Sequence, residues 1–193
     1  MLNKSTETYD IETPERPQSL KSVIISEIWS WTKLIAFTLA LAVILNQFVI
    51  VNASIPTGSM ESAIMPNDRI IAFRLSYLFS EPDRFDIVIF RYPDNESLLY
   101  VKRVIGLPGE TVTIRNGQVF INDSQTPLRD DFINDTPRGN YGPFLVPEDS
   151  YFMLGDNRNN SEDSRAWADP FVHSDGILGR AIFRYHRGFA LLN

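Results

Sequence analysis

The chain has 193 residues, a formal net charge of −6, and an ordinary globular balance of 44% hydrophobic and 22% charged residues. It contains no cysteine, which excludes disulfides, cysteine-ligated metals and a thiol nucleophile, and its two histidines are too few for a histidine-rich metal site. The acidic balance argues against a nucleic-acid partner, which would need a basic face.

The N-terminal part divides into a polar tail and an apolar run. Residues 1–22 are polar and acidic, without apolar periodicity, and are predicted to form a flexible cytoplasmic tail. Residues 34–51 carry no charge, and a helix of that length covers about 27 Å, enough to cross a membrane. Trp29 and Trp31 precede this run, where interfacial aromatic residues belong. We therefore predict a membrane anchor over residues 23–53, with its transmembrane span at about 34–51.

The flanking charges predict how this anchor is oriented. Lys21 and Lys33 lie on its N-terminal side, whereas the first cation beyond it is Arg69. Because cations stay on the cytoplasmic side of the cell membrane, the N-terminus is expected in the cytoplasm and residues 54–193 on the extracytoplasmic side. A cleaved signal peptide is the alternative, since residues 51–53 resemble a small-residue cleavage site, but the apolar run exceeds the usual ~7–15 residues.

Residues 54–193 show strand patterns throughout. Apolar and β-rich runs cover residues 69–79, 85–92, 98–105, 151–154 and 179–185. Residues 111–121 predict a hairpin that turns at Asn116-Gly117, and residues 122–147 are expected to form a long surface excursion. We therefore expect a mainly β fold, an antiparallel sheet or barrel-like catalytic domain preceded by a single N-terminal transmembrane helix.

Two residues of this domain are candidates for a nucleophile and its base. Ser59 follows Pro56 and Gly58, which suit a tight, rigid turn. Lys102 is the only lysine among the fourteen cations of residues 54–193, and it lies in an apolar strand. Loss of hydration there would lower its pKa towards the ~7–8 of catalytic lysines, a change that arginine cannot make. Serine activated by lysine is a known variant of nucleophilic catalysis.

Each candidate also has a structural interpretation. The Ser59 stretch resembles a linker, and a strand lysine often packs its stem while its head stays in water. A Ser–His–Asp site would have to use His173 or His186, but the chain has no G-x-S-x-G turn to support it. Residues 155–165 form either a solvated polar turn or a set of groups that support a site.

Taken together, these stretches resemble bacterial type I signal peptidases, which are membrane-anchored serine–lysine proteases. The resemblance runs from the anchor to the C-terminus. Four motifs carry it, in the family's order: residues 56–60, 100–109, 155–165 and 179–181.

The resemblance implies a role for each matching residue. Ser59 would be the nucleophile and Lys102 the general base, while Thr57 would donate to the oxyanion and Ser161 would orient the lysine. Structural roles at the site would fall to Arg103, Asp156, Arg158, Asp163 and Arg165. One departure concerns Ser62, three residues after the nucleophile, where the family usually has proline. It puts the local geometry in doubt.

The implied function is a membrane-bound endopeptidase that removes N-terminal signal peptides from exported preproteins after small residues at −1 and −3. No metal or cofactor is implied, and the expected partners are preproteins and the lipid bilayer, with the enzyme acting as a monomer. Four apolar residues are expected to rest on lipid: Leu75, Tyr77, Leu78 and Phe79. The alternative is a membrane-tethered, non-catalytic β module that binds peptides or envelope proteins and does not need a neutral Lys102.

Overall fold

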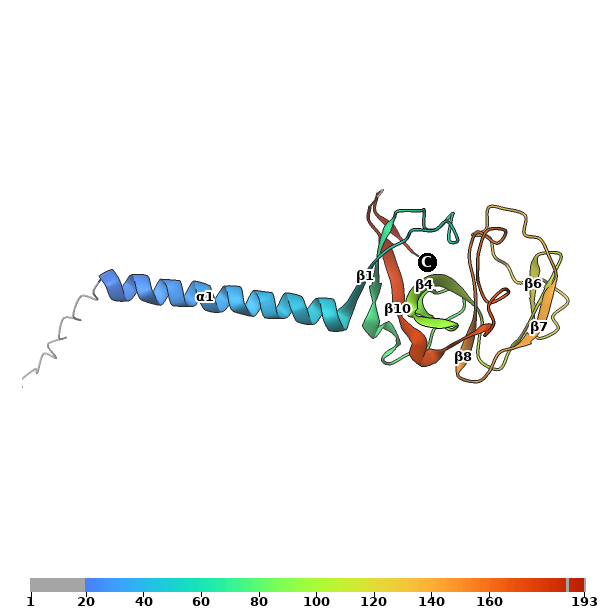
Figure 1. Ribbon diagram of the computed structural model, residues 1–193, viewed down its shortest axis with the longest axis horizontal. Helices are drawn as coiled ribbons and strands as arrows, with labels where there is room; N and C mark the ends of the chain where they lie inside the picture. Colours follow the sequence, from blue (N-terminus) through green and yellow to red (C-terminus); the bar gives the residue numbers. More distant parts are fainter. Residues whose placement is uncertain (1–19, 187, 193) are drawn as a thin grey trace, which may run out of the picture. The chain divides into compact units, whose positions relative to one another are not determined.

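The computed structural model describes residues 20–186 and 188–192, apart from the side chain of Ser22, and it divides into two units, residues 1–43 and 44–193. Residues 1–19 of the predicted tail lie outside the described residues. The first unit is the long helix drawn in Figure 1, and the second is the β-rich remainder.

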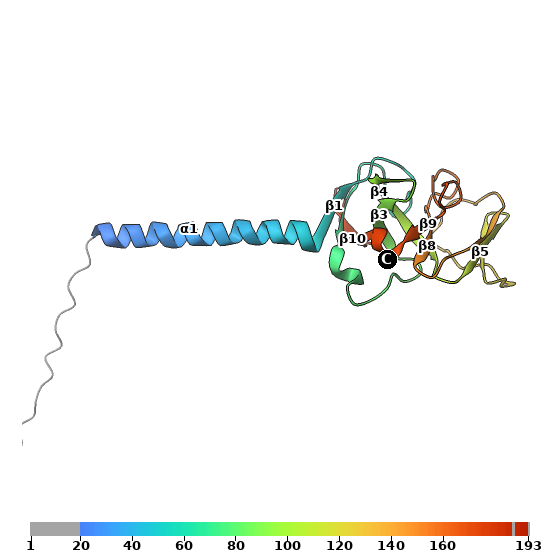
Figure 2. The same ribbon diagram turned by 60° about the horizontal axis from the view of Figure 1, so that its bottom comes forward.

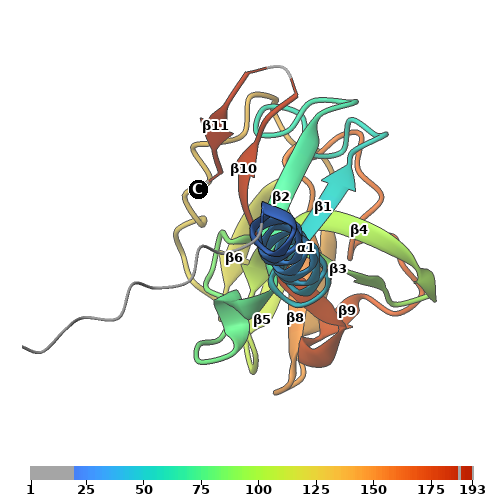
Figure 3. The same ribbon diagram turned by 90° about the vertical axis from the view of Figure 1, so that its left-hand side faces the viewer.

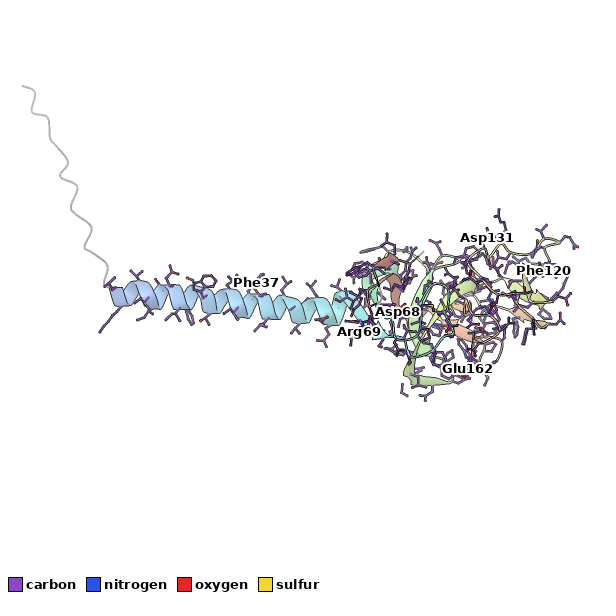
Figure 4. The ribbon with its side chains drawn as sticks, turned by 90° about the horizontal axis from the view of Figure 1, so that it is seen from above. Phe37, Asp68, Arg69, Phe120, Asp131 and Glu162 are labelled. Carbon is purple, nitrogen blue, oxygen red and sulfur yellow. The ribbon has the colours of Figure 1, made fainter. Side chains whose placement is uncertain are left out.

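The apolar run forms helix α1 (Leu20–Ile44), followed by a π-helical turn, η1 (Leu45–Val49). The run contains no glycine or proline that would interrupt a helix, and its side chains are exposed, as Phe37 illustrates in Figure 4. Residues 23–49 are long and apolar enough to cross a membrane. The predicted end of the span at residue 51 is too late, because Val51 lies in a strand and is buried in the core of the β unit.

The larger sheet contains eight of the strands in the described residues, all paired antiparallel, in the order β1-β2-β10-β3-β4-β8-β9, with β11 added to β10. Its strands are β1 (Ile50–Ser54), β2 (Arg69–Phe73), β3 (Ile87–Tyr92), β4 (Asn95–Gly106), β8 (Ser150–Leu154), β9 (Phe171–His173), β10 (Ile177–Arg184) and β11 (Ala190–Leu191). Short 3-10 turns, η2 (Arg74–Tyr77) and η3 (Ser174–Gly176), follow β2 and β9. Figure 3 shows β1 and β2 side by side. The expected mainly β, antiparallel fold is confirmed.

A second, three-stranded sheet has the order β6-β5-β7: β5 (Thr111–Arg115), β6 (Gln118–Ile121) and β7 (Tyr141–Leu145). Figures 1 and 2 both place it at the end of the β unit away from β1. The predicted hairpin is confirmed, and both Asn116 and Gly117 have the positive φ that a two-residue turn requires.

The prediction that residues 122–147 form a long surface excursion is partly wrong, because residues 141–145 form strand β7. Pro143 has no N–H to donate, but a strand at the edge of a sheet tolerates this.

Two strand edges are left open, and they position the site. Among the described residues β1 pairs only with β2, so no described strand covers its other edge. β4 pairs with β3 along residues 99–103, but its pairing with β8 begins only at Arg103. The preceding residues of β4 therefore have backbone groups without a neighbouring strand, and Lys102 lies where that open edge ends.

Candidate active site

Ser59 and Lys102, forty-three residues apart, meet in the β unit. The Lys102 Nζ lies 2.6 Å from the Ser59 Oγ. Both residues are almost completely buried, with 8% of Ser59 and 4% of Lys102 exposed. A serine hydroxyl and a lysine amine in contact, away from water, are the arrangement that a nucleophile and its base require.

The turn that carries Ser59 is held from two sides. The neighbouring Met60 is fully buried in the core beside Ile64. From the other side, the backbone N–H of Asn157 donates to the Ser59 carbonyl at 3.1 Å, and the Asn157 side chain donates to the Gly58 carbonyl at 3.1 Å. Asn157 lies in the motif of residues 155–165, but the sequence does not predict its role in fixing the nucleophile, since nothing in the sequence pairs it with residues 58–59.

Gly155 makes the close approach of these two segments possible. A Cβ at this position would collide with the Ser161 Oγ and with the Ser59 carbonyl oxygen. Only a glycine therefore lets the chain after β8 pass directly behind the nucleophile.

Burial changes the chemistry of Lys102. Loss of hydration lowers the pKa of its amine to about 8, although the carboxylates of Asp163 and Glu162 act in the opposite direction. The Arg165 guanidinium lowers the pKa further. The Tyr100 ring covers the amine, with its centroid 5.5 Å from the Nζ. Roughly one amine in ten is therefore neutral at pH 7, and a general base must be neutral to accept a proton.

The two hydroxyls to which the resemblance gives supporting roles, those of Thr57 and Ser161, both lie close to Ser59, but their contacts differ. The Thr57 Oγ1 is 3.5 Å from the Ser59 Oγ, and the Thr57 side chain is exposed. The Ser161 Oγ lies behind Ser59 but has no hydrogen-bond partner in the described part of the chain. Its predicted bond to Lys102 is not formed here, so its orienting role stays a prediction.

Two buried ion pairs lie around the dyad. The Arg103 guanidinium donates to both Asp156 oxygens, at 2.8 and 2.7 Å, and Arg165 does the same to Asp163, at 2.7 and 2.8 Å. One Asp163 oxygen also accepts from the Gly155 N–H at 3.0 Å. The motif arginines thus hold the 155–165 segment in place.

The predicted surface excursion contributes to this support. The Phe132 ring lies 4.0 Å from the Arg103 guanidinium carbon, and the Arg158 Nη1 donates to Asp130 at 2.8 Å. Ser62 donates to the Phe132 carbonyl at 2.9 Å, so this second hydroxyl bonds to the excursion. Its φ of 95° is one that proline cannot adopt, so the turn after Ser59 differs from one built around proline.

Other groups fall outside this arrangement. His173 is exposed and its Nδ1 is 2.8 Å from Asp175, while His186 lies after the end of β10. Neither lines the cavity around Ser59, so the Ser–His–Asp alternative gains no support. In the described ranges, no group of three or more histidine, aspartate or glutamate side chains is placed to hold a metal ion.

A cavity of about 510 Å³ opens beside the dyad. Its walls are the open edge of β4 at Leu99–Lys102, the β1 segment from Asn52 to Ser54, and the turn that leads to Ser59. A peptide could lie in it with a carbonyl group against the Ser59 hydroxyl.

Comparison with known proteins identifies the family. The family described as signal peptidase, peptidase S26, matches residues 28–186. A signal peptidase I from Leptolyngbya laminosa is 39% identical over 179 residues, which cover 89% of this chain and 86% of that protein. The chain belongs to the S26 family of signal peptidases. It is therefore a serine endopeptidase, and its apolar helix fits a membrane-anchored member of the family.

Two further proteins are similar to this chain. A probable signal peptidase I from Synechocystis is 41% identical, covering 75% of this chain and 67% of that protein. A crystal structure of a signal peptidase I from Enterococcus faecalis is 34% identical, with a TM-score of 0.45, and covers 52% of this chain and 97% of that one.

The Arg103–Asp156 pair predicts a large effect on stability. Asp156→Ala removes the carboxylate that balances the buried Arg103 charge, and we expect a loss of about 3–5 kcal/mol in the free energy of unfolding. Asp131→Ala is the matched control, because Asp131 pairs with Arg129 in solvent, where both side chains are at least 76% exposed. It should stay within about 0.5 kcal/mol of the parent. Denaturant unfolding in detergent micelles, followed by tryptophan fluorescence, measures both; equal losses would contradict the structural role.

Proposed function

We propose that this protein removes N-terminal signal peptides from exported preproteins, cleaving after small residues at −1 and −3, with Ser59 as nucleophile and Lys102 as general base. The observation that carries the proposal is the 2.6 Å contact between a buried amine of lowered pKa and a buried hydroxyl. A binding module that only recognises peptides would not need a neutral lysine there.

The proposed reaction begins with proton transfer. Neutral Lys102 accepts the Ser59 hydroxyl proton as the Oγ attacks the scissile carbonyl carbon. The negative charge that develops on the carbonyl oxygen is stabilised by the Ser59 backbone N–H and the Thr57 hydroxyl. When the C–N bond breaks, the Lys102 ammonium returns its proton to the leaving amine. The same amine then activates the water that hydrolyses the acyl-enzyme.

The open strand edges explain how a precursor would be held. An extended peptide between β1 and β4 can hydrogen-bond to both free edges, as in other cases of strand addition. Successive side chains of such a peptide point to opposite sides, so the residues at −1 and −3 would face the same wall. Ile55, Ile89 and Tyr100 line the cavity, and these apolar walls suit the small, uncharged side chains proposed at −1 and −3.

Ser161 would act as a positioning residue. Its buried hydroxyl has no partner in the described residues, and leaving such a group unbonded is costly, so we expect it to bond to a group of the site when a substrate is bound. Asn157, which holds Gly58 and Ser59, would position the nucleophile in the same way.

We also infer a single-pass protein of the cell membrane, acting as a monomer, with residues 54–193 extracytoplasmic. The Lys21 and Lys33 flank supports this orientation. Leu78 and Phe79, 61% and 94% exposed, follow η2, which contacts the η1 residues that leave the span. They are suited to resting on lipid. Tyr77 is not, because it is half-buried and donates to Asp86 at 2.8 Å.

The absence of cysteine makes the orientation directly testable. A single cysteine at the exposed position Ser97 should react with a membrane-impermeant maleimide in intact cells, because it lies in the extracytoplasmic unit. A single cysteine at Ser5 should react only after the cells are permeabilised. The reverse pattern would show that the anchor has the opposite orientation.

A neighbouring serine, Ser62, provides a matched control for a test of the nucleophile. Ser59→Ala should abolish cleavage of a precursor with an Ala-x-Ala site, lowering kcat by at least about a thousandfold, because it removes the hydroxyl that is hydrogen-bonded to Lys102. Ser62→Ala, which removes a hydroxyl only three residues away, should retain activity within about tenfold, because that hydroxyl bonds to Phe132. Cleavage by Ser59→Ala would reject the assignment and favour the binding-module alternative.

The lysine predicts the pH dependence of cleavage. Below its pKa the amine is protonated and has no lone pair to accept the Ser59 proton, so kcat/KM should fall as the pH decreases. The profile should rise with increasing pH and level off above about 8. Initial rates at low substrate concentration in a constant-ionic-strength buffer series measure it. A midpoint near ~10.4, the value of a hydrated lysine, would contradict the account.

A further inference from the structure

Charge is distributed unevenly around the cavity beside Ser59. Among the described residues that line it, Lys102 is the basic residue and Glu162 is the acidic residue. Most of the other lining residues are small, apolar or aromatic. The carboxylate of Glu162 therefore lies in the wall of the cavity in which the scissile bond would be placed. None of the roles implied by the family motifs includes it.

Contacts of the neighbouring residues hold the backbone around Glu162 in place. Asn160 and Glu162 line this cavity, while Asn159 and Ser161 line the neighbouring one, so the segment presents alternate side chains to the two cavities. The next residue, Asp163, is held by Arg165 and by the Gly155 N–H. In the described part of the chain, no hydrogen bond or ion pair occupies the Glu162 carboxylate, and its side chain is exposed (Figure 4).

The negative charge of Glu162 affects the pKa values of neighbouring side chains. Its charge raises the pKa of Lys102, partly offsetting the effect of burial, and it also contributes to raising the pKa of Tyr100. When Lys102 is neutral, which is its state as a base, the Glu162 charge in the cavity wall is left without a nearby compensating cation in the lining. A charge beside apolar walls is less screened than one in open solvent, so it discriminates between ligands of opposite sign.

We propose that Glu162 is a specificity-determining residue, which favours precursors with a lysine or arginine beside the cleavage site and disfavours those with an acidic residue there. The inference rests on the proposed peptidase function of this cavity. It concerns positions other than −1 and −3, whose side chains must be small. A basic precursor side chain would pair with the free carboxylate, whereas an acidic one would be repelled by it.

The test uses the full-length protein in detergent micelles and a set of Ala-x-Ala peptides. Each peptide carries one lysine, glutamine or glutamate at a single position near the cleavage site, other than −1 and −3. The measured quantity is the ratio of kcat/KM for the lysine and glutamate peptides at each position. For the parent enzyme we expect this ratio to reach about three- to tenfold at one position or at adjacent positions.

Three variants separate the effect of the Glu162 charge from that of the overall charge. Glu162→Gln should bring the ratio close to one, and Glu162→Lys should invert it. Asp131→Asn removes the same charge from an exposed acid that Figure 4 shows well away from Glu162, and it should leave the ratio unchanged. The same ratio in the parent and in Glu162→Gln at every position would overturn the proposal.

Failure of the peptidase proposal would be recognised separately. The glutamine peptides report cleavage without a charge preference, and Ser59→Ala tests whether that cleavage depends on the dyad. Cleavage that depends on Ser59 but shows no change of ratio in Glu162→Gln rejects only the role of Glu162. Cleavage that survives Ser59→Ala rejects the site itself, and with it the inference built on that site.

Discussion

The dehydration of one amine is the physical constraint on which this site depends. Lysine is a poor base in water because it is almost fully protonated at neutral pH, and only loss of hydration or nearby cations can change that. Lys102, at 4% exposure, reaches a pKa of about 8, at which roughly one amine in ten is neutral at pH 7. The fold must therefore keep water away from the amine and still leave the Ser59 side accessible to a substrate.

Strand geometry separates the charges that make this possible. Because neighbouring residues of a strand face opposite sides, β4 directs Lys102 to the cavity and Arg103 into the domain. Arg103 is always charged and buried, and it is matched by Asp156 and covered by Phe132. Arg165 is likewise matched by Asp163. Each of these fixed charges thus has its own counter-charge, so the neutral form of Lys102 remains accessible beside them.

Some of this architecture could be predicted from the sequence because the signals are local. The Asn116-Gly117 turn predicts its hairpin, and a single lysine in an apolar strand predicts a perturbed amine. What was missed depends on long-range contacts. Val51 continues an apolar run, so only its pairing with Ala72 on β2 shows that it belongs to the β unit. β7 contains glycine and proline and exists because β5 offers it an edge. The Asp130–Arg158 pair and the bonds of Asn157 to residues 58 and 59 join segments with no pattern in common.

The central claim is that Lys102 is a dehydrated, partly neutral amine in the folded enzyme, and direct titration of that amine tests it most directly. The chain has four lysines, and Lys102 is the only one after residue 33, so an NMR titration of lysine-labelled protein in micelles needs only the Lys102→Arg variant to assign its signal. The account predicts that the signal missing from Lys102→Arg titrates with a midpoint of about 8. A midpoint near ~10.4 would show a hydrated ammonium group and would contradict the Ser59–Lys102 mechanism.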